Sequence, residues 1–254
     1  MELIRKTNAI IWKNGKHENI TENTVQDKYT YLFIDHLPPR KFSTYPQDLK
    51  DFAIGYCLGE GLIEKYSDII SIKTEETNIL ITTKHEHENE EKPEYQTVNS
   101  DSAGGIRTQS DTINPIQSNL KIKATQIIKD LKHLTDEAKI WQKTGGVHVA
   151  QLKFKNNIII REDVSRHVAV DKVIGAAAKK GYDFSKSYIS YSGRMPADML
   201  IKVIRVGIPI IISNAAPASS GIDVAEKGNI TMIGFVKDNR FTVYTSPERV
   251  ELEK

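Results

Sequence analysis

The sequence predicts an α/β protein in which a layered α/β domain follows a small α+β domain. After Lys121, short apolar runs alternate with longer amphipathic segments, which is the pattern of strands and helices packed in layers. Before His85, most apolar runs have the length of strands, and one has helical spacing. Residues 97–118 are rich in Ser, Thr, Asn and Gly without periodicity, so we predict domains at 1–118 and 119–254.

Composition excludes several classes of protein. The 254 residues include 39% hydrophobic side chains, enough to bury a core, and the formal net charge of +2 argues against nucleic acid as a partner. No apolar run approaches the ~18 residues that cross a bilayer, and the start of the chain lacks a secretory pattern. We therefore expect a cytoplasmic protein without a membrane partner. The single cysteine, Cys57, excludes an intramolecular disulfide and a thiolate-rich metal site.

The first part of the chain is expected to form a hairpin, a strand and a helix. Asn14-Gly15 is a typical two-residue hairpin turn between apolar stretches. Residues 29–36 are rich in aromatic and branched side chains, and they predict a strand that Pro38-Pro39 ends. A helix is predicted from about 46 to 63, with Thr44 as its N-terminal cap.

Cys57 lies on the apolar face of this helix, together with Phe52, Ala53 and Tyr56. Burial among apolar side chains raises the pKa of a thiol, so we expect Cys57 to be unreactive. Two strands and a polar loop are expected next, at 69–74, 79–83 and 85–95.

The second part predicts a largely parallel sheet with helices packed on it. Helices are expected at 124–143, 166–180, 197–206 and 219–227. Strands are expected at 147–154, 158–161, 188–191, 208–212, 231–236 and 241–244. The first helix should bury Leu131, Leu134 and Trp141 on its inner face and end at Gly145-Gly146. Ligands of such sheets gather where strands end and helices begin.

The densest polar cluster lies at such a junction. Asp163, Arg166 and His167 follow the apolar Ile158-Ile159-Ile160 and open the next predicted helix. Free backbone amides at a helix start attract anions, and the two basic side chains would reinforce this. Alternatively, Asp163 or Ser165 simply caps the helix and the remaining charges are solvated.

Three more segments could contribute to the same pocket. Ser192, Gly193 and Arg194 combine a close backbone approach with a guanidinium that can bind phosphate. Residues 213–221 form a loop of small side chains that also precedes a helix. His148 follows two glycines, where a histidine is more often structural than catalytic. Loops that follow parallel strands share one edge of the sheet, so we expect these segments to converge.

Several of these segments resemble the motifs of the formate dehydrogenase accessory sulfurtransferase family, often called FdhD. The resemblance covers most of the chain and is specific around Asp163. Its motifs here are Ala53–Gly61, Thr144–Ala150, Glu162–Gly175, Ser192–Arg194, Ala216-Pro217, Thr231–Phe235 and Arg240–Arg249. Ser165 and Val168 depart from the family, which usually has Gly and Asn there.

The resemblance implies a fold and a function. Members take sulfur from a cysteine desulfurase and pass it to the bis-guanine-dinucleotide molybdenum or tungsten cofactor of formate dehydrogenase, which they hold by its guanine nucleotides. The implied fold places a cytidine deaminase-like domain after a small α+β domain. Met195-Pro196-Ala197-Asp198 stands where a deaminase has its zinc-binding cysteines, so neither zinc nor another metal is expected. The stretch matching the family's cofactor-binding segment is Phe241, Thr242, Val243, Tyr244, Thr245 and Ser246.

One departure from the family concerns its chemistry. Members carry Cys-x-x-Cys between the two domains, and the first cysteine bears the persulfide. Here the loop has no cysteine, and the two positions fall near Asp101 and Gly104. Catalytic activity is therefore left open, although a pocket formed by His148, Asp163, Arg166, His167, Ser192, Gly193 and Arg194 is still expected.

Three functions remain at this stage. The first is an accessory protein that binds the cofactor and assists its sulfuration, and the second is a non-catalytic chaperone of cofactor or enzyme. Hydrolysis by His148, His167 and Asp163 is a third, without a Gly-x-Ser-x-Gly motif in its favour. The expected partners are the cofactor, a cysteine desulfurase and formate dehydrogenase, and a homodimer is kept open.

Overall fold

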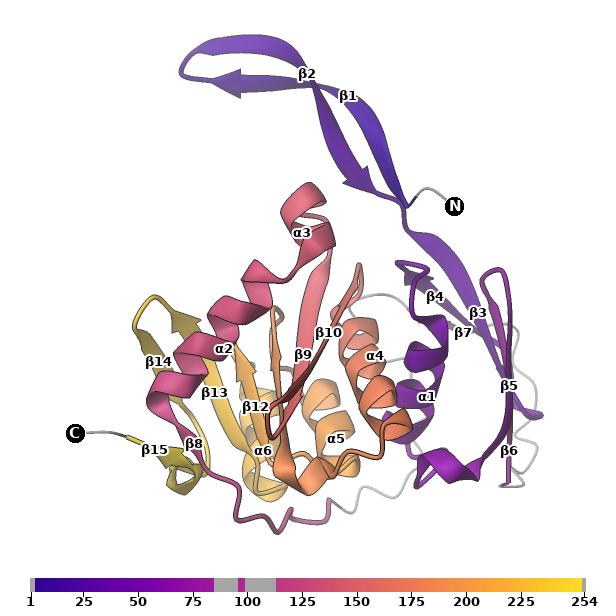
Figure 1. Ribbon diagram of the computed structural model, residues 1–254, viewed down its shortest axis with the longest axis vertical. Coiled ribbons are helices and arrows are strands. Elements are labelled where there is room, and N and C mark those ends of the chain that lie inside the picture. Colours follow the sequence, from indigo (N-terminus) through magenta and orange to yellow (C-terminus); the bar gives the residue numbers. More distant parts are fainter. Residues whose placement is uncertain (1–2, 85–95, 99–112, 253–254) are drawn as a thin grey trace.

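The computed structural model describes residues 3–84, 96–98 and 113–252 (Figure 1). The predicted loop at 85–95 and the positions near Asp101 and Gly104 lie outside the described residues. The helices are α1 (Leu49–Gly59), α2 (Ala124–Asp136), α3 (Lys139–Thr144), α4 (Arg166–Lys179), α5 (Ala197–Arg205) and α6 (Ser219–Lys227).

Fifteen strands lie in the described residues. The first seven are β1 (Ile4–Lys13), β2 (Lys16–Val25), β3 (Lys28–Ile34), β4 (Arg40–Thr44), β5 (Ile69–Glu75), β6 (Asn78–Thr83) and β7 (Gln96–Val98). The others are β8 (Ile122–Lys123), β9 (His148–Phe154), β10 (Asn157–Asp163), β11 (Ser187–Tyr191), β12 (Ile210–Ser213), β13 (Thr231–Lys237), β14 (Arg240–Val243) and β15 (Val250–Glu251).

A six-stranded sheet forms the centre of the second half of the chain, in the order β10-β9-β11-β12-β13-β14. One face buries side chains of α2, such as Ile127 and Leu134, against Ile210 and Ile212 of the sheet. The other face packs on α4, α5 and α6, with Leu200 and Ile211 in that core. The predicted layered α/β architecture is confirmed.

The prediction of a largely parallel sheet is wrong. Only the pairs β11–β12 and β12–β13 are parallel, whereas β10, β9 and β14 run antiparallel to their neighbours. Strands β9 and β10 are joined by a tight hairpin, and such a turn can only connect antiparallel strands. The sheet is therefore mixed.

The first half of the chain contributes a second sheet of five strands, in the order β5-β6-β3-β4-β7. Helix α1 lies between this sheet and α4 (Figure 1). A Cβ atom at Gly55 of α1 would lie 1.8 Å from the carbonyl oxygen of Asp171 in α4. A Cβ at Gly175 of α4 would lie 1.9 Å from the carbonyl oxygen of Asp51 in α1. The two helices thus cross at van der Waals contact of their backbones, and one hydrophobic core includes both.

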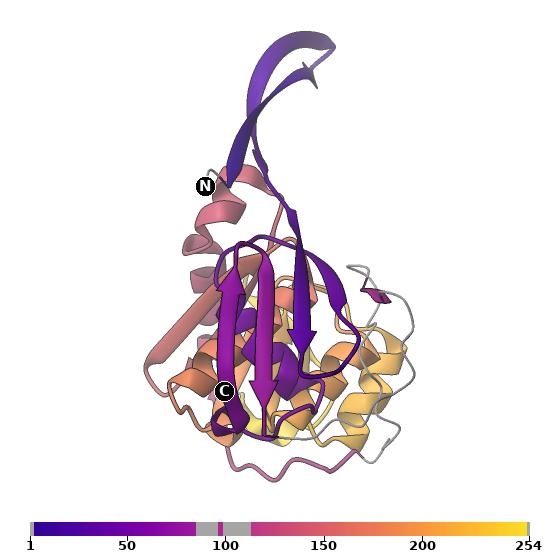
Figure 2. The same cartoon turned by 90° about the vertical axis from the view of Figure 1, so that its right-hand side faces the viewer.

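Strands β1 and β2 form a separate hairpin, as the turn at Asn14-Gly15 predicts. Both turn residues have positive φ, 53° and 79°, which suits this dipeptide. Figures 1 and 2 show the hairpin extending away from the rest of the molecule, and we call residues 4–25 the arm.

Two local predictions need correction. Helix α1 begins at Leu49, and Thr44 does not cap it, because Thr44 pairs with Lys28 across β3 and β4. The predicted helix at 124–143 is two helices, α2 and α3, and Trp141 is 41% exposed instead of buried. The carboxylate of Glu162 accepts hydrogen bonds from the backbone N–H groups of Ile140 and Trp141, which starts α3 as a new helix.

Candidate functional site

The predicted polar segments meet at one edge of the six-stranded sheet. Strands β10, β11, β12 and β13 end at this edge, and β9 begins there, so that Asp163 lies opposite His148. The parallel register also places Tyr191, at the end of β11, beside Ser213, at the end of β12. The expected convergence of these loops is confirmed for the described residues.

His148 contacts the loop that follows β11. Its Nδ1 lies 3.0 Å from the carbonyl oxygen of Ser192, and since a carbonyl only accepts, Nδ1 carries the proton. The Ser192 hydroxyl accepts a hydrogen bond from the backbone N–H of Val149 at 2.9 Å. These contacts hold His148 and Ser192 together.

Gly193 joins the loops that follow β10, β11 and β12. A Cβ at position 193 would lie 2.8 Å from a ring carbon of Tyr191 and 3.0 Å from Cδ of Arg166, so only glycine fits. On its other side, the Ser213 hydroxyl donates a 2.7 Å hydrogen bond to the Gly193 carbonyl. The aliphatic part of buried Arg166 therefore packs directly against the Ser192–Arg194 loop.

His167 faces a carboxylate that sequence reasoning did not identify. Its Nε2 lies 3.3 Å from Oδ2 of Asp198, which is in the first turn of α5. Burial lowers the pKa of His167 below its ordinary value of 6.5, although Asp198 acts in the opposite direction. At neutral pH His167 is thus mostly uncharged, and it offers hydrogen bonds to a ligand more than positive charge.

Arg194 is the exposed cation of the site. Its carbonyl accepts a 2.6 Å hydrogen bond from the Tyr191 hydroxyl, which fixes the backbone of the loop. Within the described part of the chain, the guanidinium has no hydrogen-bond or ion-pair partner. A guanidinium that is held on a fixed loop and makes no ion pair there is suited to binding phosphate.

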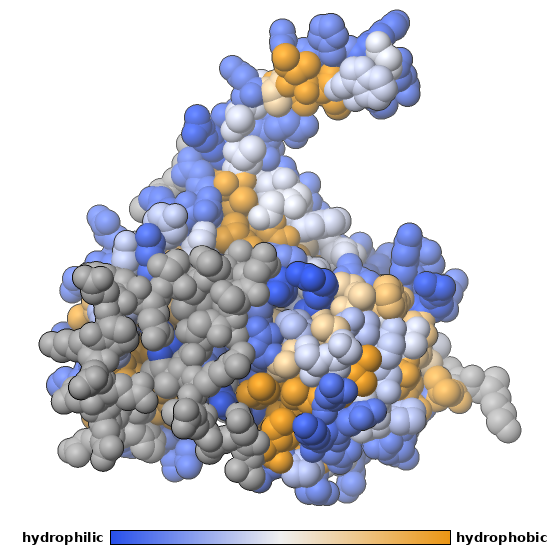
Figure 3. Space-filling model, turned by 180° about the vertical axis from the view of Figure 1, so that it is seen from behind, coloured by the Kyte–Doolittle hydropathy of each residue, from blue (hydrophilic) through white to orange (hydrophobic). Residues whose placement is uncertain are grey.

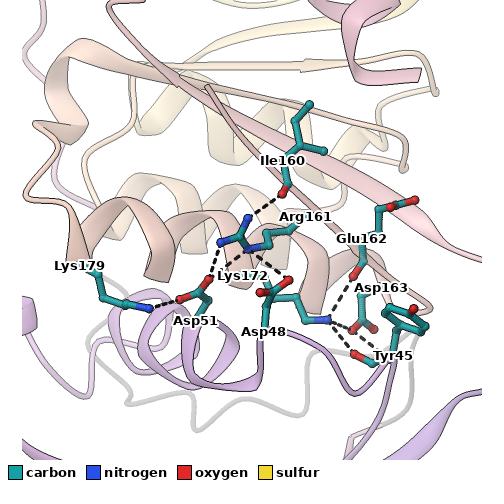
Figure 4. A network of polar contacts seen from close by, with 9 residues as sticks. All are labelled: Tyr45, Asp48, Asp51, Ile160, Arg161, Glu162, Asp163, Lys172 and Lys179. Atoms are coloured by element: carbon teal, nitrogen blue, oxygen red, sulfur yellow. Dashed lines mark hydrogen bonds and ion pairs between the residues drawn. The ribbon is translucent and has the colours of Figure 1, made fainter. Parts of the chain in front are cut away.

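Asp163 has a structural environment instead (Figure 4). Its carboxylate is fully buried, lies 2.7 Å from Nζ of Lys172, and accepts hydrogen bonds from the backbone N–H groups of Tyr45 and Ser165. Lys172 also donates to the carbonyl oxygens of Tyr45 and Glu162. All of these contacts are within the protein, and they attach the segment before α1 to the start of α4.

A second ion-pair group continues the same connection (Figure 4). The carboxylate of Asp51, in the first turn of α1, lies 2.8 Å from both Arg161 and Lys179. Arg161 also lies 3.4 Å from Asp48. The charged motif around Asp163 therefore has two roles. It forms part of the edge of the six-stranded sheet, and it holds α1 against β10 and α4.

The stretch from Phe241 to Ser246 extends along the sheet rather than around the edge. Tyr244 points toward the loops, because a Cβ at Gly234 would lie 3.1 Å both from its ring and from Cε of Met195. Thr245 and Ser246 lie at the start of β13, where Thr245 donates to the carbonyl of Ile230 and the Ser246 carbonyl accepts from Thr231. Three residues of β13, about 10 Å, separate that level from the edge. On β14, Thr242 pairs with Gly234 at the level of the edge, and Val243 pairs with Ile233 one residue before it. Phe241 lies one residue beyond Thr242 on the same strand.

Cys57 is fully buried in α1, and burial raises its pKa, as the helical spacing predicts. Among the residues that the structure describes, no group of three or more His, Cys, Asp or Glu side chains is arranged to hold a metal ion. No helix in the described ranges is long and apolar enough to cross a membrane.

Comparisons with known proteins place this geometry in context. The model of the FdhD/NarQ family matches residues 25–251. The sulfur carrier protein FdhD of Methanothermobacter thermautotrophicus is 42% identical over 250 residues, which cover 98% of this chain and 100% of that protein. Protein FdhD of Methanocaldococcus jannaschii is 34% identical and covers 92% of this chain and 93% of its own.

A similar fold is also found among solved structures. A crystal structure of a protein from Desulfotalea psychrophila, reported as a formate dehydrogenase accessory protein, superposes with a TM-score of 0.80. The alignment covers 98% of this chain and 100% of the other, at 22% sequence identity.

Proposed function

The chain belongs to the FdhD/NarQ family, and from this membership and the geometry of the sheet edge we propose that it serves formate dehydrogenase by binding its molybdenum or tungsten cofactor. In this proposal the client is the bis-guanine-dinucleotide form of the cofactor, held by a guanine nucleotide in the cytoplasm. Two further expectations remain part of it: a division near residue 118 into two structural units, which share one hydrophobic core, and a cytidine deaminase-like second domain. The order helix, sheet, helices in residues 119–254 supports the latter.

One observation carries the proposal: the exposed guanidinium of Arg194 has no hydrogen-bond or ion-pair partner among the described residues. We assign Arg194 to a phosphate of the diphosphate, with the start of α5 close by in sequence. His148 and His167 would then contact the base or sugar through hydrogen bonds, with His167 mostly uncharged at neutral pH. Asp163, which is fully engaged by Lys172 and two backbone amides, acts by holding the loops in place.

Sulfur transfer requires a thiol, and here the chain differs from relatives that are named sulfur carriers. Cys57 is the only cysteine of the sequence, and it is fully buried with a raised pKa. A buried, protonated thiol neither reaches a desulfurase nor attacks its persulfide. We therefore propose that this chain presents the cofactor while a persulfide on another protein supplies the sulfur and returns to the thiol.

Calorimetry with guanosine diphosphate tests the binding half of the proposal. We expect binding to wild-type protein, and Arg194→Ala should weaken it about tenfold or more, because a charge-assisted hydrogen bond contributes about 1.5–3 kcal/mol. Lys227→Ala is the control, since it removes an exposed cation from the last turn of α6. Absence of binding at millimolar nucleotide, or equal affinity in Arg194→Ala, would contradict the proposal.

A second function, that of a non-catalytic chaperone without any role in sulfuration, is favoured by the same buried cysteine. Reconstitution of formate dehydrogenase with a desulfurase separates the two. If the chain raises the sulfur content of the cofactor, it assists sulfuration; if it raises only the amount of cofactor inserted, it is a chaperone. Persulfide label on Cys57 after incubation with the desulfurase would overturn both, because the chain would then be a carrier itself.

A further inference from the structure

The arm has the surface of a binding element, and neither the sheet-edge site nor the family's chemistry makes use of it. Its two strands pair only with each other in the described structure, so the outer edge of β1 is unpaired along Ile4–Lys13. An isolated two-stranded hairpin is at best marginally stable in water, and it gains stability when a third strand or a partner surface is added. Near the base of the arm, β2 packs against the turn that follows α3: a Cβ at Gly146 would lie 2.8 Å from Val25. The β1 edge is therefore the more accessible of the two.

The two faces of the arm differ in chemistry. Since side chains alternate across a strand and Trp12 pairs with His17, one face carries Ile10 and Trp12 together with Lys6 and His17. Ile10 is 68% exposed and Trp12 is 72% exposed. Both acidic residues of the arm, Glu18 and Glu22, are opposite odd-numbered residues of β1 and lie on the other face. The face with Trp12 is thus apolar and basic, without a carboxylate.

A hollow lies halfway along the arm. It is shallow and open to solvent, and its lining comes from both faces of the hairpin: Asn8, Ala9, Ile10, Asn19, Ile20 and Thr21. Figure 3 shows hydrophobic side chains gathered in the outer part of the arm, with hydrophilic ones around them. An exposed apolar area with a polar surround is typical of a surface that binds another protein.

The charge of the arm indicates what kind of partner it binds. Its four cations, Arg5, Lys6, Lys13 and Lys16, outnumber its two carboxylates, which leaves +2, equal to the formal charge of the whole chain. None of these cations has an ion-pair partner among the described residues. On the face with Trp12, Lys6 is the one charged side chain, and it is complementary to a carboxylate of an acidic protein segment. A second copy docked arm to arm would bring like charges together. Duplex DNA is disfavoured because the apolar face offers a single lysine, and tight binding neutralises several phosphates.

We propose that the β1 edge of the arm binds an acidic, extended segment of a partner protein as a third strand. The backbone of the segment pairs with the open N–H and C=O groups of β1. Apolar side chains of the segment lie beside Ile10 and Trp12, and a carboxylate lies beside Lys6. Cross-strand pairs of these kinds are known to stabilise sheets. The inference is independent of nucleotide binding at the sheet edge.

Fluorescence of Trp12 tests the inference in the full-length protein. The chain has two tryptophans, so Trp141→Phe leaves Trp12 as the reporter. The probe is a nine-residue synthetic peptide with two valines two positions apart and a glutamate four positions further, all on one face. We expect it to shift the emission of Trp12 to the blue, and a peptide with lysine in place of the glutamate should bind about five- to tenfold more weakly.

A charge swap in the protein is the matched control. In Lys6→Glu, the preference should reverse, so that the lysine peptide binds more tightly than the glutamate peptide. N-methylation of the peptide amides that face β1 should abolish the shift, because it removes the backbone hydrogen bonds of the added strand.

Four results with added peptide or DNA would overturn the inference, and a fifth comes from the oligomeric state. The four are no shift with the glutamate peptide at millimolar concentration, equal binding of the two peptides, full binding of the N-methylated peptide, and a shift at lower concentration with duplex DNA. Light scattering measures the oligomeric state and so tests whether a second copy of the chain covers the arm. A wild-type dimer that Trp12→Ser converts to monomer would show that it does.

Discussion

At the scale of single residues, burial separates the polar side chains of the sheet edge into two groups. Asp163 and Arg166 are buried, and Asp163 is engaged entirely by protein groups, whereas Arg194 is exposed on a fixed loop. His167 lies between these extremes: it is largely buried, with 13% of its side chain exposed, and it lies 3.3 Å from Asp198. Its protonation therefore depends on the balance between burial and that carboxylate.

Removing the charge of Asp198 should change this balance in a measurable direction. In Asp198→Asn we expect the pKa of His167 to fall further below 6.5, because the nearby carboxylate charge that opposes the effect of burial is lost. NMR titration of the imidazole signals, assigned with His167→Gln, measures the change. Asp223→Asn, an exposed position on α6, is the control and should leave the His167 signal unchanged. An unchanged or higher pKa in Asp198→Asn would show that Asp198 does not interact with His167.

The same shift has a consequence for stability. Because the pKa of His167 is lower in the folded than in the unfolded protein, the unfolded state takes up the proton first as pH falls. The contribution of His167 to the free energy of unfolding is therefore fully present above about pH 6.5, where the imidazole is neutral in both states. It is lost as pH falls from there through the folded-state pKa of His167.

The sequence allowed some of these residues to be predicted and not others. Ser192, Gly193, Arg194 and His148 were found because small residues, a glycine pair and a basic side chain mark the ends of strands. Asp198 was missed as a partner of His167, since a carboxylate in the first turn of a helix is common and contact with another helix start leaves no local signal. The burial of Asp163 depends on Tyr45 and Lys172, which are distant in sequence.

At the scale of elements, tertiary contacts explain where local prediction failed. Strand β4 was not expected because Arg40-Lys41-Phe42-Ser43-Thr44 looks polar, yet Arg40 is buried and donates a hydrogen bond to the hydroxyl of Tyr56. The break between α2 and α3 depends on Glu162, which lies on β10. Elements with strong periodicity or clear end signals, such as α4, α6 and the hairpin of the arm, agree closely with the structure.

The crossing of α1 and α4 predicts a strong effect at Gly175. Gly175→Ala should lower the free energy of unfolding by more than about 3 kcal/mol, because the new Cβ would meet the backbone of Asp51, which cannot move aside. Gly228→Ala is the matched control: its nearest neighbour is the Cδ1 methyl of Ile204, a side-chain tip that can rotate away. Urea unfolding followed by circular dichroism measures both variants. If Gly175→Ala costs no more than Gly228→Ala, the crossing is not as close as the structure indicates.

At the scale of the whole molecule, the arm and the core are organised in opposite ways. The arm carries exposed apolar side chains away from the body, while a single core continues from the five-stranded sheet through α1 to α4 and the six-stranded sheet. The change in composition at residues 97–118 indicated two domains, but composition contains no information on packing between them. The polar contacts of Asp51 and Tyr45 with α4 and β10 cross the same predicted boundary.

This organisation predicts which fragments fold. Residues 26–254, without the arm, should fold with a single cooperative unfolding transition, since the arm forms its own two-stranded sheet. Residues 119–254 alone should not form a stable native state, because the face of α4 that packs on α1 becomes exposed. Lys172 and Asp163 also lose their contacts with the backbone of Tyr45. Circular dichroism and thermal unfolding of both fragments provide the comparison. A fragment 119–254 that unfolds cooperatively at the temperature of the full chain would show that the shared core is a contact between two independently stable domains.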